Sequence, residues 1–243
     1  MEHLEAIQEK GWFADDNVSE NHDFNNTMEQ ILYFLHYKPE KQIRQVSEPW
    51  ASLYLNYGAI LFELGRIDEA RTVLEKARRF NPVSPEIAFE YIETFKVKGD
   101  LETFAEKTRD TFRFAYRSTD VARCFRNLGY YFVEKELWQP AFACYRLSLS
   151  YDRDNANAMS ELYYISQHAG DIKISSREEI RQLADQYDFP VKADDQILAV
   201  AASLGNKELE KRNIPAAKFF LNIFYDLTRD EEVKKLIDRL EHH

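Results

Sequence analysis

The chain has 243 residues, of which 44% are hydrophobic and 14% aromatic, so its composition excludes an intrinsically disordered protein. Its formal net charge is −10, which disfavours a nucleic-acid binder and a protein that binds anionic membranes. With only seven glycines and seven prolines, the chain is expected to be mostly helical.

The negative charge is concentrated near the start of the chain. Residues 1–50 hold ten Asp/Glu and four Lys/Arg, which accounts for −6 of the −10. No apolar run approaches the length of a membrane span, and the first ten residues, MEHLEAIQEK, lack the apolar stretch of a signal peptide. We therefore expect a cytoplasmic protein without membrane binding.

Residues 1–50 are predicted to form an N-terminal helical segment. We expect a helix over 2–10 and a loop at 15–17. A second helix over 24–37 is predicted by the spacing of Met28, Ile31, Leu32, Phe34 and Leu35. A short helix near 40–47 would pair with it, in which case this segment is a divergent copy of the units that follow.

Glycines mark a period of 34 residues further along the chain. Gly65 and Gly99 are 34 residues apart, and Gly58 and Gly129 are 71 apart, which is two periods plus three residues. Gly205 occupies the same place in a later unit. A period of this length is typical of stacked helix–turn–helix units.

Residues 51–84 form the clearest unit. Gly65 ends its first helix, because glycine accepts the left-handed backbone that follows a helix. Asp68 and Glu69 open the second helix, where acidic groups suit the positive helix end. Small residues at Gly58 and Ala70 would let the two helices approach closely.

This unit resembles the tetratricopeptide repeat. Eight residues occupy the family's places in register: Tyr54, Tyr57, Gly58, Leu61, Ala70, Leu74, Ala77 and Pro82. The resemblance implies an all-α right-handed superhelix, a solenoid of degenerate tetratricopeptide repeats over residues 51–230.

The later units follow the pattern unequally. Units 122–155 and 198–231 keep most of it, whereas 85–118 and 156–189 are degenerate. Thr108 and Thr111 stand where apolar or small residues are usual, so unpaired buried hydroxyl groups are expected there. Residues 119–121 and 190–197 exceed the period, and the second stretch predicts a longer connection. Residues 231–241 are predicted to form a C-terminal capping helix, and residues 240–243 are typical of an expression-tag remnant.

No catalytic motif is present, and we expect no enzymatic activity, cofactor or metal site. His3, His22, His36 and His168 are far apart in sequence, and a surface position is predicted for each. The two cysteines, Cys124 and Cys144, are expected to be reduced and buried as small apolar side chains.

The resemblance further implies that the first helix of each unit lines a concave groove. The candidate partner-binding residues on these helices are Arg123, Arg126, Asn127, Tyr130 and Tyr164. Arginine grips carboxylates, and exposed tyrosine is favoured at interfaces. Two alternatives stay open: the arginines pair with Glu90, Glu93 or Glu161, and the tyrosine rings pack between neighbouring first helices.

The function predicted is a protein–protein interaction scaffold that binds a protein or peptide, with no nucleic acid. One alternative is an accessory or regulatory repeat region of a larger enzyme or signalling protein. A further alternative is an enzyme whose residues converge only in the folded chain.

Overall fold

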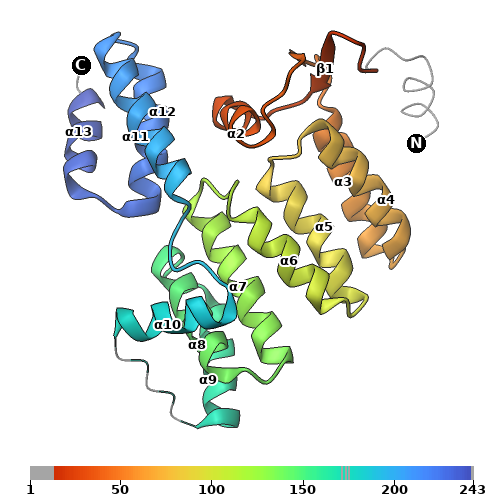
Figure 1. Cartoon of the computed structure of the whole chain (residues 1–243), viewed down its shortest axis with the longest axis vertical. Helices are drawn as coiled ribbons and strands as arrows, with labels where there is room; N and C mark the ends of the chain where they lie inside the picture. The colour runs from red at the N-terminus through yellow and green to blue at the C-terminus, as the bar shows by residue number, and fades with distance from the viewer. Residues whose placement is uncertain (1–13, 171, 173, 175, 242–243) are drawn as a thin grey trace. The chain divides into compact units, whose positions relative to one another are not determined.

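The computed structural model describes residues 14–170, 172, 174 and 176–241. These residues form a small two-stranded sheet and a succession of antiparallel helix pairs (Figure 1). The chain divides into two compact units, residues 1–100 and 101–243. The predicted fold class, an all-α solenoid of helical repeats, is confirmed.

The first unit begins with a strand–helix–strand motif. Strand β1 (Ser19–His22) pairs in parallel with β2 (Gln42–Gln45), and helix α2 (Thr27–Tyr37) connects them. Asn26 caps α2 by accepting a hydrogen bond from the Glu29 amide, so the predicted helix over 24–37 is confirmed with a later start.

The short helix predicted near 40–47 is wrong, because this segment is strand β2. Its backbone is satisfied by the other strand: the Gln42 amide donates to Val18 and the Val46 amide donates to His22, both at 2.9 Å. The predicted helix over 2–10 lies outside the described residues.

The strand–helix–strand motif packs on the end of helix α4 (Ile67–Phe80). The Asp23 amide donates to the Phe80 carbonyl oxygen at 2.9 Å, and His22 Nδ1 lies 3.1 Å from the same oxygen. His22 is only 6% exposed, so the surface position predicted for it is wrong. Its ring stacks against Phe24, and burial lowers its pKa.

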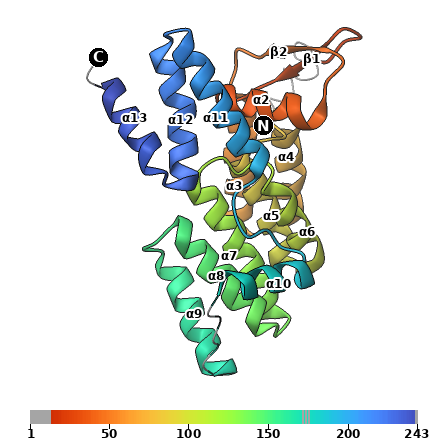
Figure 2. The same ribbon diagram turned by 60° about the vertical axis from the view of Figure 1, so that its left-hand side comes forward.

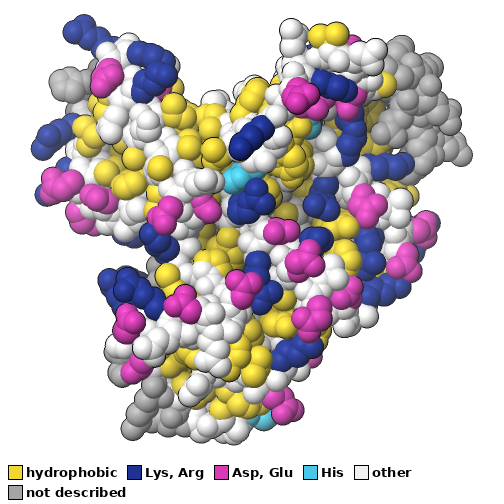
Figure 3. All heavy atoms as spheres, in the orientation of Figure 1, with side chains coloured by type: hydrophobic (Ala, Val, Ile, Leu, Met, Phe, Trp, Pro, Cys, Tyr) yellow, Lys and Arg dark blue, Asp and Glu magenta, His cyan; other side chains and the backbone are white. Residues whose placement is uncertain are grey.

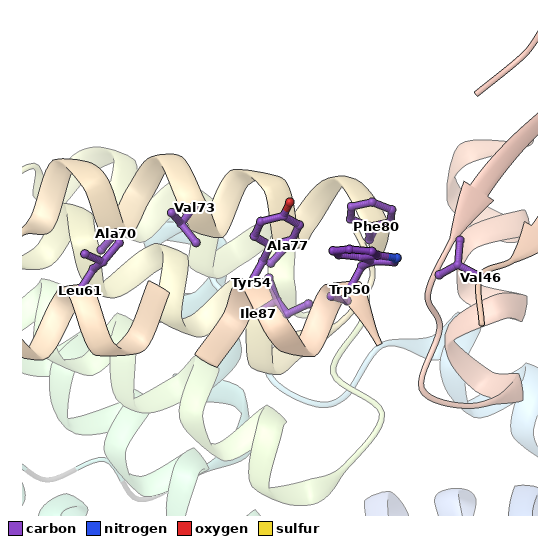
Figure 4. Packing of buried hydrophobic residues seen from close by; sticks show 10 residues of the cluster. Val46, Trp50, Tyr54, Leu61, Ala70, Val73, Ala77, Phe80 and Ile87 are labelled. Atoms are coloured by element: carbon purple, nitrogen blue, oxygen red, sulfur yellow. The ribbon is translucent and has the colours of Figure 1, made fainter. Parts of the chain in front are cut away.

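Helices α3 (Trp50–Glu63) and α4 form the first helical hairpin. The rings of Trp50, Tyr54 and Phe80 lie together in its core, where they are shielded from solvent (Figure 4). Gly65 has φ +73° and ends α3 in the left-handed conformation, as predicted. Helix α5 (Pro85–Val97), capped by Ser84, packs against both helices and completes the described part of this unit.

The second unit contains the hairpin of α7 (Ser118–Glu134) and α8 (Trp138–Tyr151), preceded by α6 (Leu101–Thr111). The prediction of unpaired hydroxyl groups in α6 is wrong. Thr108 donates to the Phe104 carbonyl and Thr111 donates to the Lys107 carbonyl, both at 2.8 Å. A threonine in a helix can bond to the carbonyl of the preceding turn, so these two positions are buried without an orphan donor.

Residues 156–189 depart from the hairpin geometry of the other units. Helix α9 (Ala156–Ala169) packs against α8, and α10 (Arg177–Tyr187) also has α8 as its main helix partner (Figure 2). At the end of α10, Tyr187 and Phe189 meet the ring of Phe132 on α7. Much of the surface of α9 is therefore left exposed.

The C-terminal part consists of α11 (Asp195–Glu210), α12 (Ile214–Thr228) and α13 (Glu231–Glu241). Helices α11 and α12 form a hairpin, and α13 packs against α12 (Figure 1). Asp226 of α12 accepts hydrogen bonds from the amide and hydroxyl of Ser118, at 2.7 and 3.0 Å, which ties α12 to the start of α7.

Two hairpins turn without glycine. Glu136 and Arg212 take the place that Gly65 has in the first hairpin, and their φ values are +56° and +59°. A left-handed backbone is unfavourable for a residue with a Cβ. We expect Glu136→Gly and Arg212→Gly each to raise the free energy of unfolding by about 0.5–1 kcal/mol.

Urea denaturation of the two single variants tests this expectation. The matched control is Gly65→Ala, which places a Cβ at φ +73° and should lower the free energy of unfolding. A loss of stability in both glycine variants would show that the Glu136 and Arg212 side chains contribute more than the backbone strain costs.

Candidate functional site

The first four candidate residues form one stripe of helix α7, because residues three and four apart share a helix face. Arg123, Arg126 and Tyr130 are half-buried on this stripe, and Asn127 is 7% exposed. On the face drawn in Figure 3, acidic and basic side chains are scattered among hydrophobic ones. Charge alone does not single out a site there, so the contacts of each residue decide its role.

Arg126 is engaged by groups of its own chain. Its guanidinium donates to the Asp152 carboxylate at 3.1 Å and to the Ser148 hydroxyl at 3.3 Å. Asn155 donates to the same carboxylate at 2.8 Å and caps α9 by accepting from the Ala158 amide at 3.0 Å. This series of hydrogen bonds joins α7 to the start of α9.

For Arg126 the series agrees with the alternative that the arginines pair with nearby acids, but its partner is Asp152, which follows α8, and not one of the glutamates. Burial lowers the pKa of Arg126 despite the nearby carboxylate. The side chains of Arg126 and Asp152 are 20% and 30% exposed, so solvent screens the pair only in part.

Removing this link is expected to loosen α9. Arg126→Ala leaves the Asp152 carboxylate without its charged donor, and we expect a loss of about 1.5–3 kcal/mol in the free energy of unfolding. Asp152→Ala should cost a similar amount, and the double variant should cost less than the two added, because both changes break one interaction. Chemical denaturation of the three variants measures this, and strict additivity would contradict the link.

Asn127 and Tyr130 lie in the same neighbourhood. Among the described residues, Asn127 Nδ2 is buried with no hydrogen-bond partner. The Tyr130 ring meets Phe104 of α6 edge-on, with centroids 5.8 Å apart. Burial is the main cause that raises the pKa of Tyr145, and the nearby Glu161 and Tyr130 raise it further. Tyr145 of α8 packs against Gly129 of α7, where an added Cβ would lie 2.7 Å from the Tyr145 ring.

Tyr164 belongs to an aromatic cluster that the sequence analysis missed. Its ring centroid lies 4.0 Å from that of His168 and 6.4 Å from that of Trp138. Met159, Tyr163 and Tyr164 are 47%, 68% and 44% exposed, so α9 presents large apolar side chains to solvent. The four-residue spacing of Tyr164 and His168 was a usable signal, but the contribution of Trp138 depends on how α8 and α9 pack.

Two pairs of tyrosines are adjacent in sequence, Tyr130 with Tyr131 on α7 and Tyr163 with Tyr164 on α9. Adjacent residues of a helix point about 100° apart, so the two rings of a pair cannot enter one core. Tyr130 and Tyr131 are both half-buried, and the Tyr131 hydroxyl donates to Glu102 at 2.9 Å. Tyr163 and Tyr164 are both exposed. The second pair is thus the more accessible to a partner.

Among the described residues, no group of three His, Cys, Asp or Glu side chains could hold a metal ion. Within the same part of the chain, every helix is too short or too polar to cross a membrane. Cys124 and Cys144 are free thiols and fully buried, as predicted, and burial raises the pKa of both.

The family model described as tetratricopeptide repeat matches residues 51–94. This match covers α3, α4 and most of α5, and it confirms the resemblance found in that part of the sequence. The chain therefore contains a tetratricopeptide repeat there. No curated protein matches the chain.

Three solved structures are similar to the chain at low identity. Against a chain of the APC/C hetero-tetramer Cut9-Hcn1, identity is 17% and the TM-score 0.46, with 89% of this chain and 39% of that chain covered. Against pilF of Pseudomonas aeruginosa, identity is 15% and the TM-score 0.43, with 72% of this chain and 74% of that chain covered. Against a thermophilic TPR protein of Thermus thermophilus, identity is 15% and the TM-score 0.39, with 79% of this chain and 100% of that chain covered. These TM-scores all lie below 0.5, so the fold assignment rests on the helical repeats described above.

Proposed function

We propose that this chain, which contains a tetratricopeptide repeat at residues 51–94, is a non-enzymatic protein–protein interaction scaffold. It binds a peptide or helix of a partner along the first helices of its later units. The binding surface, called the α7–α9 surface below, consists of Arg123 and Tyr130 on α7 and Met159, Tyr163 and Tyr164 on α9.

The observation that carries this proposal is the exposure of α9. Its main helix partner is α8, and Ala158 and Ile165 are its only fully buried residues among those described. Its exposed residues include Met159, Tyr163, Tyr164 and His168. Clustered apolar side chains at a protein surface are typical of interaction sites, and tyrosine is enriched in interface cores.

The remaining candidate residues, Arg126 and Asn127, stabilise the packing beneath this surface. Arg126 holds the start of α9 through Asp152 and Asn155. Asn127 lies on the same stripe of α7. Arg123 is one turn before them and contributes a positive charge, which favours an acidic segment or a terminal carboxylate as the part of the partner bound here.

A peptide selection tests the proposal. Peptides selected from a random-sequence library for binding to the chain are labelled, and their affinity is measured by fluorescence anisotropy. We expect Tyr164→Ala and Arg123→Glu each to weaken binding by about tenfold or more, because interface energy concentrates in a few aromatic and arginine residues.

Matched controls show whether a loss of binding is specific to the α7–α9 surface. Phe34→Ala removes an aromatic ring that is 47% exposed in the first unit, and Arg153→Glu reverses an exposed charge in the turn after α8. Both should bind the selected peptides like the parent. If the Tyr164 and Arg123 variants remain folded by circular dichroism and also bind like the parent, the α7–α9 surface is not the binding site.

A further inference from the structure

Helices α8 and α10 and the segment after α10 line an open pocket of about 400 Å³ within the second unit. Four basic side chains surround it: Arg146 on α8, Arg177 and Arg181 on α10, and Lys192 in the following segment. These residues are distant in sequence and are brought together because α10 packs on α8 (Figure 2). None of them belongs to the α7–α9 surface.

The four charges are largely available to a ligand. All four side chains are exposed. Among the described residues, Arg146 and Arg177 have no ion pair. Arg181 lies 3.6 Å from Glu178 and Lys192 lies 2.5 Å from Asp195, and both pairs are more than half exposed. Exposed pairs of this kind are weak and exchange readily with a competing anion.

The pocket also has an apolar lining. Leu147 of α8, Ile180 of α10 and Val191 contribute to it, and each is partly buried. Ser150 is one turn after Leu147, and its hydroxyl already donates to the Leu147 carbonyl at 2.6 Å. The lining therefore combines an apolar surface with positive charges around it.

We propose that this pocket binds an acidic peptide segment in which an apolar side chain is flanked by carboxylates. The apolar side chain would lie against Leu147, Ile180 and Val191, and the carboxylates would meet the arginine guanidiniums. Arginine binds a carboxylate in a bidentate manner, and the volume is at the lower end for ligand pockets. A simple inorganic anion would leave the apolar lining unused.

The charge of the whole protein supports an electrostatic basis for selectivity. The chain carries a net charge of −10, of which −6 lies in residues 1–50, so the molecule as a whole does not attract an acidic ligand. A local cluster of positive charge then directs such a ligand to one place, and the attraction weakens as the salt concentration rises. The proposal does not depend on the α7–α9 surface, because the pocket between α8 and α10 contains none of that surface's residues.

The test uses a fluorescein-labelled peptide of sequence Glu-Glu-Leu-Leu-Glu-Glu and the full chain. Binding is measured by fluorescence anisotropy at low and high salt. We expect saturable binding that weakens with salt and is reduced by about tenfold or more in the double variant Arg177→Glu, Arg181→Glu. The control Arg153→Glu, Lys207→Glu makes the same change in net charge at two exposed positions outside the pocket and should bind like the parent.

Peptide variants separate the contribution of the apolar side chain from that of the carboxylates. Replacing the leucines by serine, or the glutamates by glutamine, should each weaken binding by about tenfold. Tripolyphosphate should compete only weakly. Strong tripolyphosphate binding with no effect of the leucine change would show an anion site without peptide recognition, which would overturn the proposal.

Folding and site identity are checked in the same series. Where the charge reversal lowers the melting temperature, Arg146→Gln with Arg177→Gln removes two charges without adding acids. It should also weaken binding. Tyr164→Ala should leave this peptide's affinity unchanged, so failure here is distinguishable from failure of the proposed function. No binding by the parent, or equal loss in the charge-matched control, contradicts the proposal.

Discussion

Replacing Gly58 by leucine is expected to destabilise the first helical hairpin strongly. A Cβ placed on Gly58 would lie 2.6 Å from Cγ of Leu74, a fully buried side chain. Because the core cannot take more volume at this contact, we expect the free energy of unfolding to fall by roughly 1–3 kcal/mol or more. Urea denaturation followed by circular dichroism measures the change.

Two companion variants make the result specific. Asn56→Leu adds the same side chain at an exposed position of the same helix and should change stability by less than about 0.5 kcal/mol. Gly58→Ala combined with Leu74→Ala should cost less than the two single changes added, because the smaller side chain at position 74 makes room for the new Cβ. If Gly58→Leu left the free energy of unfolding unchanged, the alignment of residues 51–84 with the tetratricopeptide pattern would be wrong.

Glu29→Leu is expected to have the second large effect. The Glu29 side chain is 1% exposed, and its carboxylate accepts hydrogen bonds from the Asn25 amide and the Asn81 side chain, both at 2.7 Å. Leucine would leave the buried Asn81 side chain without this acceptor and would remove the acceptor of the more exposed Asn25 amide. We expect the free energy of unfolding to fall by about 2–4 kcal/mol, measured by urea denaturation.

The control for Glu29 is Glu40→Leu, which removes an exposed carboxylate from the same N-terminal region and should be nearly neutral. Glu29→Gln keeps one acceptor oxygen and should lie between the two. A Glu29→Leu variant as stable as the parent would show that the strand–helix–strand motif does not depend on this buried carboxylate.

The helical hairpins could be predicted because their signals are local. Gly58, Gly129 and Gly205 each face a bulky residue 16 positions later, namely Leu74, Tyr145 and Leu221, and a Cβ on any of them would lie within 2.8 Å of that side chain. This close approach fixes glycine in the first helix of each hairpin. A regular spacing in the sequence therefore reports a repeated contact.

The strands could not be predicted in the same way. Strand β2 spans only four residues, Gln42–Gln45, and three of its four residues are exposed, so it has no apolar alternation to reveal it. Its hydrogen-bond partner is β1, about twenty residues earlier. Parallel pairing of this kind depends on tertiary structure, which short sequence patterns do not contain.

The candidate site was predictable in outline but not in its contacts. The stripe on α7 follows from helical spacing, whereas the partner of Arg126 is Asp152, in the turn beyond α8. The pocket on α8 and α10 was missed because its cations lie at positions 146, 177, 181 and 192, and only the packing of α10 on α8 gathers them.

Hydrogen exchange of the chain with and without a bound library-selected peptide tests the central claim most directly. Exchange is read by mass spectrometry over each helix. The proposed scaffold function predicts slower exchange in α7 and α9 when the peptide is bound, and the loss of that protection in Tyr164→Ala. Protection confined to α2–α5 or to α11–α13, with α7 and α9 unchanged, would contradict it.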